Sequence, residues 1–155
     1  MVISGGTQAN FTGNALERFV EHHLVTAGYV RVSPRQFKPA IYNEQPIYPR
    51  RFRAGTSIYE TPIYADFAIY HPQRWPDCLI IEAKWQQVGG SVDEKYPYLV
   101  MNIQNRYCYR TVLLLDGTGY KKGAERWVRN QAGSQNLLHV FSMAEFQTWA
   151  NKGNI

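Results

Sequence analysis

"LIIEAKWQQ", residues 79–87, places two opposite charges at the end of an apolar stretch. Three aliphatic residues open it, as expected for a buried strand, and Glu82 and Lys84 then follow with only Ala83 between them. Residues i and i+2 of a strand point to the same side, so we expect both charges on one face and Ala83 in the packing on the other. An isolated E-x-K triplet is common and is typical of a loose ion pair at a solvated strand end. At the end of a buried strand, however, a charge needs a partner or a metal ion to offset its desolvation.

A second acid lies upstream, within another strand pattern. Asp66 sits among alternating apolar residues, where aspartate is disfavoured. If the two strands are neighbours, Asp66 and Glu82 come to lie on one face. Paired carboxylate oxygens suit Mg²⁺, the Ala83 carbonyl offers a third ligand, and Lys84 could orient or deprotonate a metal-bound water. Phosphodiester hydrolysis needs these groups, because a divalent ion lowers the pKa of its water and stabilises charge on a phosphate oxygen.

With these residues the chain resembles the PD-(D/E)XK nuclease superfamily. The likeness lies in "YAD" at residues 64–66 and "IIEAKWQ" at residues 80–86. It implies a restriction endonuclease-like α/β core, in which a mixed central sheet is flanked by helices. It also implies that Asp66 is the first acid of the family motif, Glu82 the second acid and Lys84 the motif lysine.

Further parts of the chain are similar to the same superfamily in the expected order. Glu17 matches the acid often found on the first helix, and Gln86 matches a polar residue two places after the lysine. Ala65 stands where the family usually has a proline. The stretch 89–100, "GGSVDEKYPYLV", resembles the Gly-Ser turn and E-K-x-P helix that follow the motif in restriction-like members. The stretch 113–127 resembles the next core strand with its loop and helix.

The resemblance implies an enzyme, a Mg²⁺-dependent endonuclease of restriction type that acts on DNA, with Mn²⁺ able to replace Mg²⁺. The cleaved bond would be P–O3′, which leaves a 5′-phosphate. A homodimer would be needed to cut both strands with one site per chain. Three alternatives stay open: a nuclease for branched DNA or RNA, a homing or mobile-element nuclease, and a catalytically quiet nucleic-acid-binding subunit of a larger assembly.

A cluster of arginines around Phe52 gives a candidate surface for nucleic acid. In "PRRFRAG", residues 49–55, the arginines could clamp phosphates while Phe52, Tyr48 and Tyr59 stack on bases or sugars, or the segment could be a solvated basic loop. The segment after the motif adds a serine and a lysine. The residues predicted to contact nucleic acid are Arg50, Arg51, Arg53, Ser91 and Lys95.

Length, charge and cysteine content are consistent with a single nuclease domain. With 155 residues, 45% of them hydrophobic, the chain is long enough for one domain with a real core, and we expect a single nuclease domain over residues 1–155. The formal net charge of +5 favours polyanionic partners. The two cysteines form no C-x-x-C pair, and we see neither a signal peptide nor a membrane segment, so we expect a cytoplasmic protein.

The order of elements predicts an α/β domain with a mixed sheet. Asn14 is the expected N-cap of the first helix, and Pro97 indicates that a helix after Ser91 is short or starts late. The expected helices cover 13–29, a segment after 91, 121–133 and 142–153. The expected strands cover two segments within 56–71 that are broken near Pro62, then 78–85, 111–116 and 136–141. Residues 33–49 read as an irregular connector.

Overall fold

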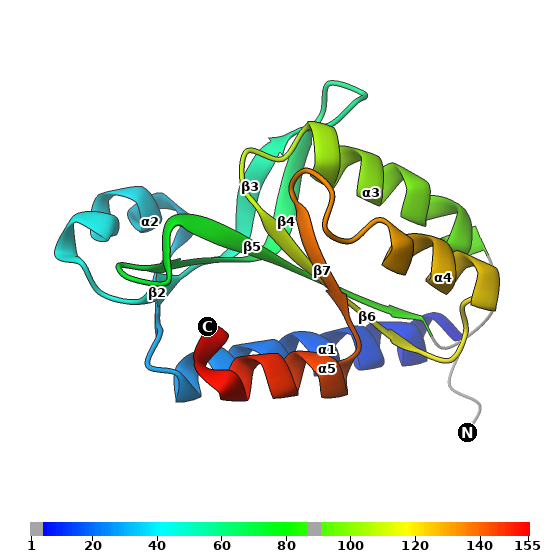
Figure 1. The fold of residues 1–155 in the computed structure, drawn as a ribbon, viewed down its shortest axis with the longest axis horizontal. Helices are drawn as coiled ribbons and strands as arrows, with labels where there is room; N and C mark the ends of the chain where they lie inside the picture. The colour runs from blue at the N-terminus through cyan, green and yellow to red at the C-terminus, as the bar shows by residue number, and fades with distance from the viewer. Residues whose placement is uncertain (1–4, 87–90) are drawn as a thin grey trace.

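The strand that carries Glu82 and Lys84 lies inside a mixed sheet (Figure 1). A computed structural model describes residues 5–86 and 91–155, with the side chains of residues 13–86 and 93–155. Strand β5 (Trp75–Gln86) pairs antiparallel with β4 (Pro62–His71) and parallel with β6 (Thr111–Gly117). Because strands flank it on both sides, β5 is an interior strand. Of the two charges at its end, Glu82 is buried at 2% exposure and Lys84 is 39% exposed.

Further strands continue the sheet on both sides of β4, β5 and β6. In the described residues the sheet order is β1-β2-β4-β5-β6-β7, with β3 also paired to β4. The remaining strands are β1 (Val30–Arg31), β2 (Ile47–Tyr48), β3 (Arg50–Thr56) and β7 (Leu137–Phe141). The helices are α1 (Gly5–Thr26), α2 (Pro34–Ala40), α3 (Lys95–Asn105), α4 (Lys122–Asn130) and α5 (Met143–Trp149), with shorter helical segments at Ile41–Asn43, Ser91–Glu94 and Ala150–Asn154. The predicted α/β class with a mixed sheet and flanking helices is confirmed.

Two helical layers cover the two faces of the sheet (Figure 1). On one face, α1 and α5 pack through residues such as Val20 and Phe146 against Phe67 and Ile81. On the other face lie α2, α3 and α4, and the second core cluster includes Val100 of α3. The alternation of side chains along β5 therefore divides the core into two layers, one on each side of the sheet.

The first helix is longer than the sequence predicts. It begins at Gly5, so the prediction of Asn14 as its N-cap is wrong, and Asn14 is an exposed residue within the helix. The apolar stripe that includes Leu16 and Val20 is buried as expected and anchors the helix to the sheet. Gly28 lies just beyond the helix end with a φ of 92°, as expected for a helix stop.

The arginine segment is a strand and not a loop. Strand β3 runs antiparallel to β4, and its buried residues Phe52 and Ala54 alternate with exposed arginines. This period-2 pattern was present in the sequence, but the arginines concealed it. The strand expected upstream of Pro62 is wrong, because Ser57 accepts hydrogen bonds from the backbone N–H groups of Tyr59 and Thr61 and closes a turn there. The connector predicted over 33–49 is also wrong in part, since it contains α2 and β2.

The later elements follow the prediction closely. Strands β6 and β7 and helices α4 and α5 are confirmed, and the Ser142 side chain caps α5 by accepting a hydrogen bond of 3.2 Å from the Glu145 N–H. Helix α3 starts late, at Lys95, as Pro97 predicted. The glycines of the predicted Gly-Ser turn, residues 89 and 90, lie outside the described residues. Both cysteines are free thiols, and in the described part of the chain no helix has the length and apolarity to cross a membrane.

A close backbone approach fixes the segment that follows α3. Gly55 of β3 lies against Arg106, and a Cβ at position 55 would collide with the Arg106 carbonyl oxygen. A single bridge also joins Gly55 to Tyr107. Glycine is needed at this position because two backbones meet there. The contact places Tyr107 over the sheet, close to the end of β5.

Candidate active site

Asp66 and Glu82 lie next to each other on neighbouring strands. Phe67 of β4 pairs with Ile81 of β5, which brings the residues just beyond this pair, Asp66 and Glu82, side by side. Asp66 Oδ2 also accepts a hydrogen bond of 2.8 Å from the backbone N–H of Ala83. The sheet register therefore brings together the two acids that the sequence singled out.

Glu82 is a buried carboxylate with a specific donor. Its side chain is only 2% exposed, and its Oε1 accepts a hydrogen bond from the Tyr107 hydroxyl. Burial raises the pKa of Glu82 to about 7, although the Lys84 ammonium opposes the shift; the Asp66 carboxylate adds to it, and the Tyr107 hydrogen bond opposes it. Tyr107 was not predicted, because nothing in the local sequence around it indicates a contact with a strand far upstream.

Lys84 links the two acids. Its Nζ lies 3.4 Å from Glu82 Oε2 and 3.6 Å from Asp66 Oδ2. Burial lowers the pKa of Lys84, but the two carboxylates raise it by more, so the pKa lies above the usual lysine value. A protonated amine can orient a water molecule and offset negative charge, whereas it cannot remove a proton.

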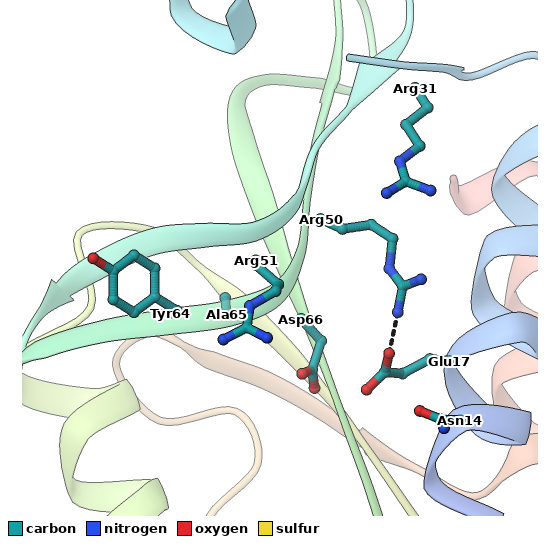
Figure 2. A pocket seen from close by; sticks show the side chains of 8 residues that line it. All are labelled: Asn14, Glu17, Arg31, Arg50, Arg51, Tyr64, Ala65 and Asp66. Atoms are coloured by element: carbon teal, nitrogen blue, oxygen red, sulfur yellow. Dashed lines mark hydrogen bonds and ion pairs between the residues drawn. The ribbon is translucent and has the colours of Figure 1, made fainter. Parts of the chain in front are cut away.

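A polar cavity opens in front of Asp66 (Figure 2). It has a volume of about 490 Å³ and holds both acidic and basic side chains. Its lining residues are Asn14, Glu17, Arg31, Arg50, Arg51, Tyr64, Ala65 and Asp66. Figure 2 shows the Glu17 carboxylate and the Asp66 carboxylate on the two sides of this space. Glu17, which the family resemblance matched to the acid of the first helix, thus shares a cavity with Asp66.

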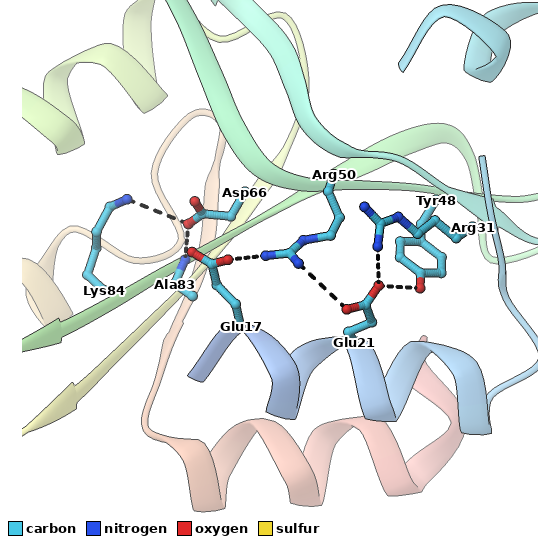
Figure 3. Close-up of polar contacts among 8 residues, drawn as sticks. All are labelled: Glu17, Glu21, Arg31, Tyr48, Arg50, Asp66, Ala83 and Lys84. Atoms are coloured by element: carbon cyan, nitrogen blue, oxygen red, sulfur yellow. Dashed lines mark hydrogen bonds and ion pairs between the residues drawn. The ribbon is translucent and has the colours of Figure 1, made fainter. Parts of the chain in front are cut away.

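A row of alternating charges leads away from Glu17 (Figure 3). Arg50 forms an ion pair with Glu17 and lies 3.7 Å from the Glu21 carboxylate. The Arg31 guanidinium lies 3.4 Å from the Glu21 carboxylate. The Tyr48 hydroxyl donates a hydrogen bond of 2.7 Å to the same carboxylate. The charged side chains of this row are more exposed than Glu82, so water and ions screen their charges more strongly, whereas Tyr48 is buried.

Two consecutive arginines line the same cavity, which a regular strand would not allow. Neighbouring strand residues point to opposite faces, yet Arg50 and Arg51 both line the cavity of Asp66. Arg51 has a φ of 52°, in the left-handed region that is unfavourable for a residue with a Cβ. It lies between the paired residues Arg50 and Phe52, hence opposite Asp66. This local backbone conformation explains why both guanidinium groups reach the cavity.

The remaining predicted residues lie elsewhere. Arg53 is exposed and its guanidinium lies 3.4 Å from the Thr56 hydroxyl, outside the lining of the polar cavity. Lys95, at the start of α3, lines a second cavity. Ser91 begins a short helical segment, but its side chain lies outside the described residues.

Gln86 is buried beneath the site. Its side chain is 3% exposed, accepts a hydrogen bond of 2.7 Å from the Tyr96 hydroxyl and donates one of 3.2 Å to the Gly119 carbonyl. It shares a strand face with Glu82 and Lys84, because it lies two residues after Lys84 in the same strand. Gln86 therefore positions Tyr96, which lines the second cavity, and the loop that follows β6.

The donor set fits a divalent cation. Asp66 and Glu82 supply hard oxygen ligands, and Mg²⁺ is typically bound by one or two protein carboxylates while it keeps several waters. Among the described residues, no three His, Cys, Asp or Glu side chains converge as a ready-made metal cluster. The acids thus meet as a pair, which leaves the other ligand positions to waters and to phosphate oxygens.

Comparison with known families supports the same chemistry. The family model described as PD-(D/E)XK nuclease superfamily domain matches residues 8–154, nearly the whole chain. The match confirms the resemblance found in the sequence motifs. No curated protein and no solved structure matches the chain.

Proposed function

This chain belongs to the PD-(D/E)XK nuclease superfamily, and from that premise we propose that it is a Mg²⁺-dependent endonuclease that hydrolyses phosphodiester bonds in DNA. Members of the superfamily generally use divalent metal ions, and a nuclease domain acts on nucleic acid. The observation that carries the proposal is the convergence of Asp66, Glu82 and Lys84, with the Lys84 ammonium within 3.6 Å of both carboxylates.

In the proposed mechanism Asp66 and Glu82 would hold the metal ion, and the Ala83 carbonyl would be a further ligand. When bound, the ion would supply a water of lowered pKa and stabilise charge on a phosphate oxygen. Lys84 orients the attacking water and offsets negative charge in the transition state through its ammonium group. Tyr107 keeps Glu82 in position by donating to one of its oxygens.

The arginines of the polar cavity would bind the phosphate backbone. Arg51 faces the site without an acidic partner among the contacts of the described residues, so its guanidinium is available to a phosphate. Arg50 is paired with Glu17, and it can hold this acid as an accessory ligand near Asp66. Bidentate contacts from arginine would fix the strand relative to the acids without reading its sequence.

A plasmid cleavage assay tests the proposal. Supercoiled DNA is incubated with the purified chain in Mg²⁺, in Mn²⁺ and in EDTA. We expect nicked or linear products with either metal and none in EDTA, with 5′-phosphates at the new ends. DNA binding without cleavage under all three conditions would contradict the proposal and would fit a quiet binding subunit. Parallel reactions with RNA and with branched DNA identify the substrate class.

The proposed restriction-type activity adds a requirement for two sites. One chain carries one acid pair, so double-strand cleavage needs two copies acting together. Sedimentation of the chain with and without DNA measures the number of copies. We expect two copies on a cleavable duplex; a stable monomer that only nicks DNA would argue against restriction-type cleavage.

A further inference from the structure

A second cavity lies on the other side of Tyr64 from the polar one, and it is mostly apolar. It has a volume of about 360 Å³, within the range of pockets that enclose small ligands. Its walls come from the start of β4, from Lys84 of β5 and from α3 with the segment that follows it. The apolar wall consists of Pro62, Ile63, Leu99 and the rings of Tyr64, Tyr96 and Tyr98.

Tyr98, which lines this cavity, stacks on Tyr59, which lies outside the lining. The rings of Tyr59 and Tyr98 lie 5.2 Å apart, at 19° to each other, although Tyr59 is 72% exposed and Tyr98 is 37% exposed. The turn that carries Tyr59 is held in place, because the buried Asn102 of α3 accepts a hydrogen bond of 3.0 Å from the Ile58 N–H. The chain therefore presents a flat, ordered aromatic surface to solvent. Such surfaces are typical of sites where nucleobases stack.

The apolar cavity is joined to the candidate active site. Lys84 contributes to its wall while its ammonium lies 3.6 Å from Asp66 in the neighbouring polar cavity. Tyr64 lines both cavities and is 58% exposed. Lys95 adds a second positive charge at the apolar cavity. An apolar ligand in this cavity would thus lie beside two cations, Lys84 and Lys95. It would also lie next to a substrate phosphate that Lys84 and Arg51 hold at the active site.

We propose that the apolar cavity binds one unpaired nucleobase of the substrate, in the nucleotide next to the scissile phosphate. The inference rests on the proposed metal-dependent nuclease function and specifies its substrate as nucleic acid that is single-stranded at the cleavage position, in place of the fully paired duplex that restriction-type cleavage requires. A nucleobase combines a flat apolar body with an attached anion, which matches the rings and lysines of this site. A base within a duplex is stacked on both faces and must leave the helix before it can enter a pocket, which has an energetic cost that an unpaired base avoids.

Binding without cleavage tests the inference directly. Fluorescence anisotropy in EDTA compares a single-stranded DNA oligonucleotide with the duplex of the same sequence. We expect Tyr98→Ala to weaken single-strand binding about tenfold and duplex binding less than about twofold, because base–aromatic stacking supplies the difference. Tyr98→Phe keeps the ring and should bind as the wild type does. Tyr42→Ala, at an 89% exposed tyrosine that lines neither cavity, is the matched control.

Cleavage in Mg²⁺ separates this inference from the function on which it rests. We expect a duplex with a single-stranded overhang to be cut faster than a fully paired duplex, and Tyr98→Ala to remove that preference. Cleavage that depends on Asp66 but is equal on both substrates, with binding unchanged in Tyr98→Ala, would overturn the inference and leave the proposed function intact. No metal-dependent cleavage of any substrate would overturn the proposed function itself. Equal losses for single strand and duplex in Tyr98→Ala, or losses in Tyr98→Phe, would show a structural defect and would also overturn the inference.

Discussion

The two cavities that meet at Tyr64 differ in the forces they can exert on a substrate. The polar cavity places the Asp66 carboxylate opposite Glu17 and beside two arginines, so charge dominates there. The apolar cavity encloses its space with aliphatic and aromatic side chains, so hydrophobic contact and stacking dominate. Lys84 lines the apolar cavity, and its ammonium lies 3.6 Å from Asp66 of the polar cavity. The comparison indicates that the fold separates phosphate chemistry from base recognition, and variants on each side should have separable effects.

The largest expected effect comes from removing the acid that faces the polar cavity. In Asp66→Ala we expect single-turnover cleavage to fall roughly 10³-fold or more, because a metal ion supplies several kcal/mol of transition-state stabilisation and each 1.36 kcal/mol is tenfold in rate. DNA binding in EDTA should stay close to the wild-type value. Asp77→Ala, at an exposed acid on the same strand β5, is the control. Wild-type turnover by Asp66→Ala would show that the polar cavity is not where hydrolysis occurs.

Lys84→Ala is expected to have the next largest effect, since this side chain forms ion pairs with both Asp66 and Glu82. Loss of one charged donor to the transition state lowers rates by about 10²–10³-fold. The cleavage rate is measured at saturating substrate, with Lys38→Ala on the exposed face of α2 as the control. If Lys84→Ala changed only the affinity and not the rate, its role would be confined to binding.

Tyr107→Phe should have a smaller effect than Lys84→Ala, and it should lower both the stability and the cleavage rate. The substitution removes the hydroxyl that donates a hydrogen bond to the buried Glu82. A buried acceptor left without a donor costs about 1–3 kcal/mol of stability. Urea unfolding measures that loss, and we expect a fall in cleavage of about tenfold along with it. Tyr109→Phe, whose ring packs 5.6 Å from Phe52, is the comparison. If Tyr107→Phe and Tyr109→Phe had the same stability and the same cleavage rate, Glu82 would not depend on the hydrogen bond from Tyr107.

Arg51→Ala tests the polar cavity with the smallest expected effect. One lost phosphate contact should reduce the slope of log affinity against log salt by about 0.9. Cleavage at saturating DNA should change only a few-fold. Arg53→Ala, on the same strand but outside the cavity, should leave the slope unchanged. Equal salt slopes for Arg51→Ala and Arg53→Ala would mean that Arg51 contributes no more to phosphate binding than Arg53 does.

The sequence was sufficient for the parts of the site that depend on local periodicity. Glu82 and Lys84 share a face because a strand alternates, and this follows from three consecutive residues. The pairing of Asp66 with Glu82 needed only the assumption that two consecutive strands are neighbours, which the register supports.

The rest of the site depends on contacts between distant segments. Tyr107 reaches Glu82 because the backbone of its segment passes over Gly55, and no local pattern indicates such a crossing. The position of Arg51 depends on a left-handed backbone conformation that its residue type disfavours. The apolar cavity forms only when α3 packs beside the start of β4. These features belong to the folded chain and are not encoded in any single stretch of it.

Metal binding measured directly, without substrate, tests the central claim of a carboxylate pair that holds one divalent cation. Isothermal titration calorimetry with Mn²⁺ compares the wild type with Asp66→Ala and with Glu82→Gln, and circular dichroism checks that each variant is folded. We expect one binding site in the wild type and a loss of affinity of at least about tenfold in each folded variant. Unchanged Mn²⁺ binding in both variants would contradict the account, because the two acids would then not be the ligands.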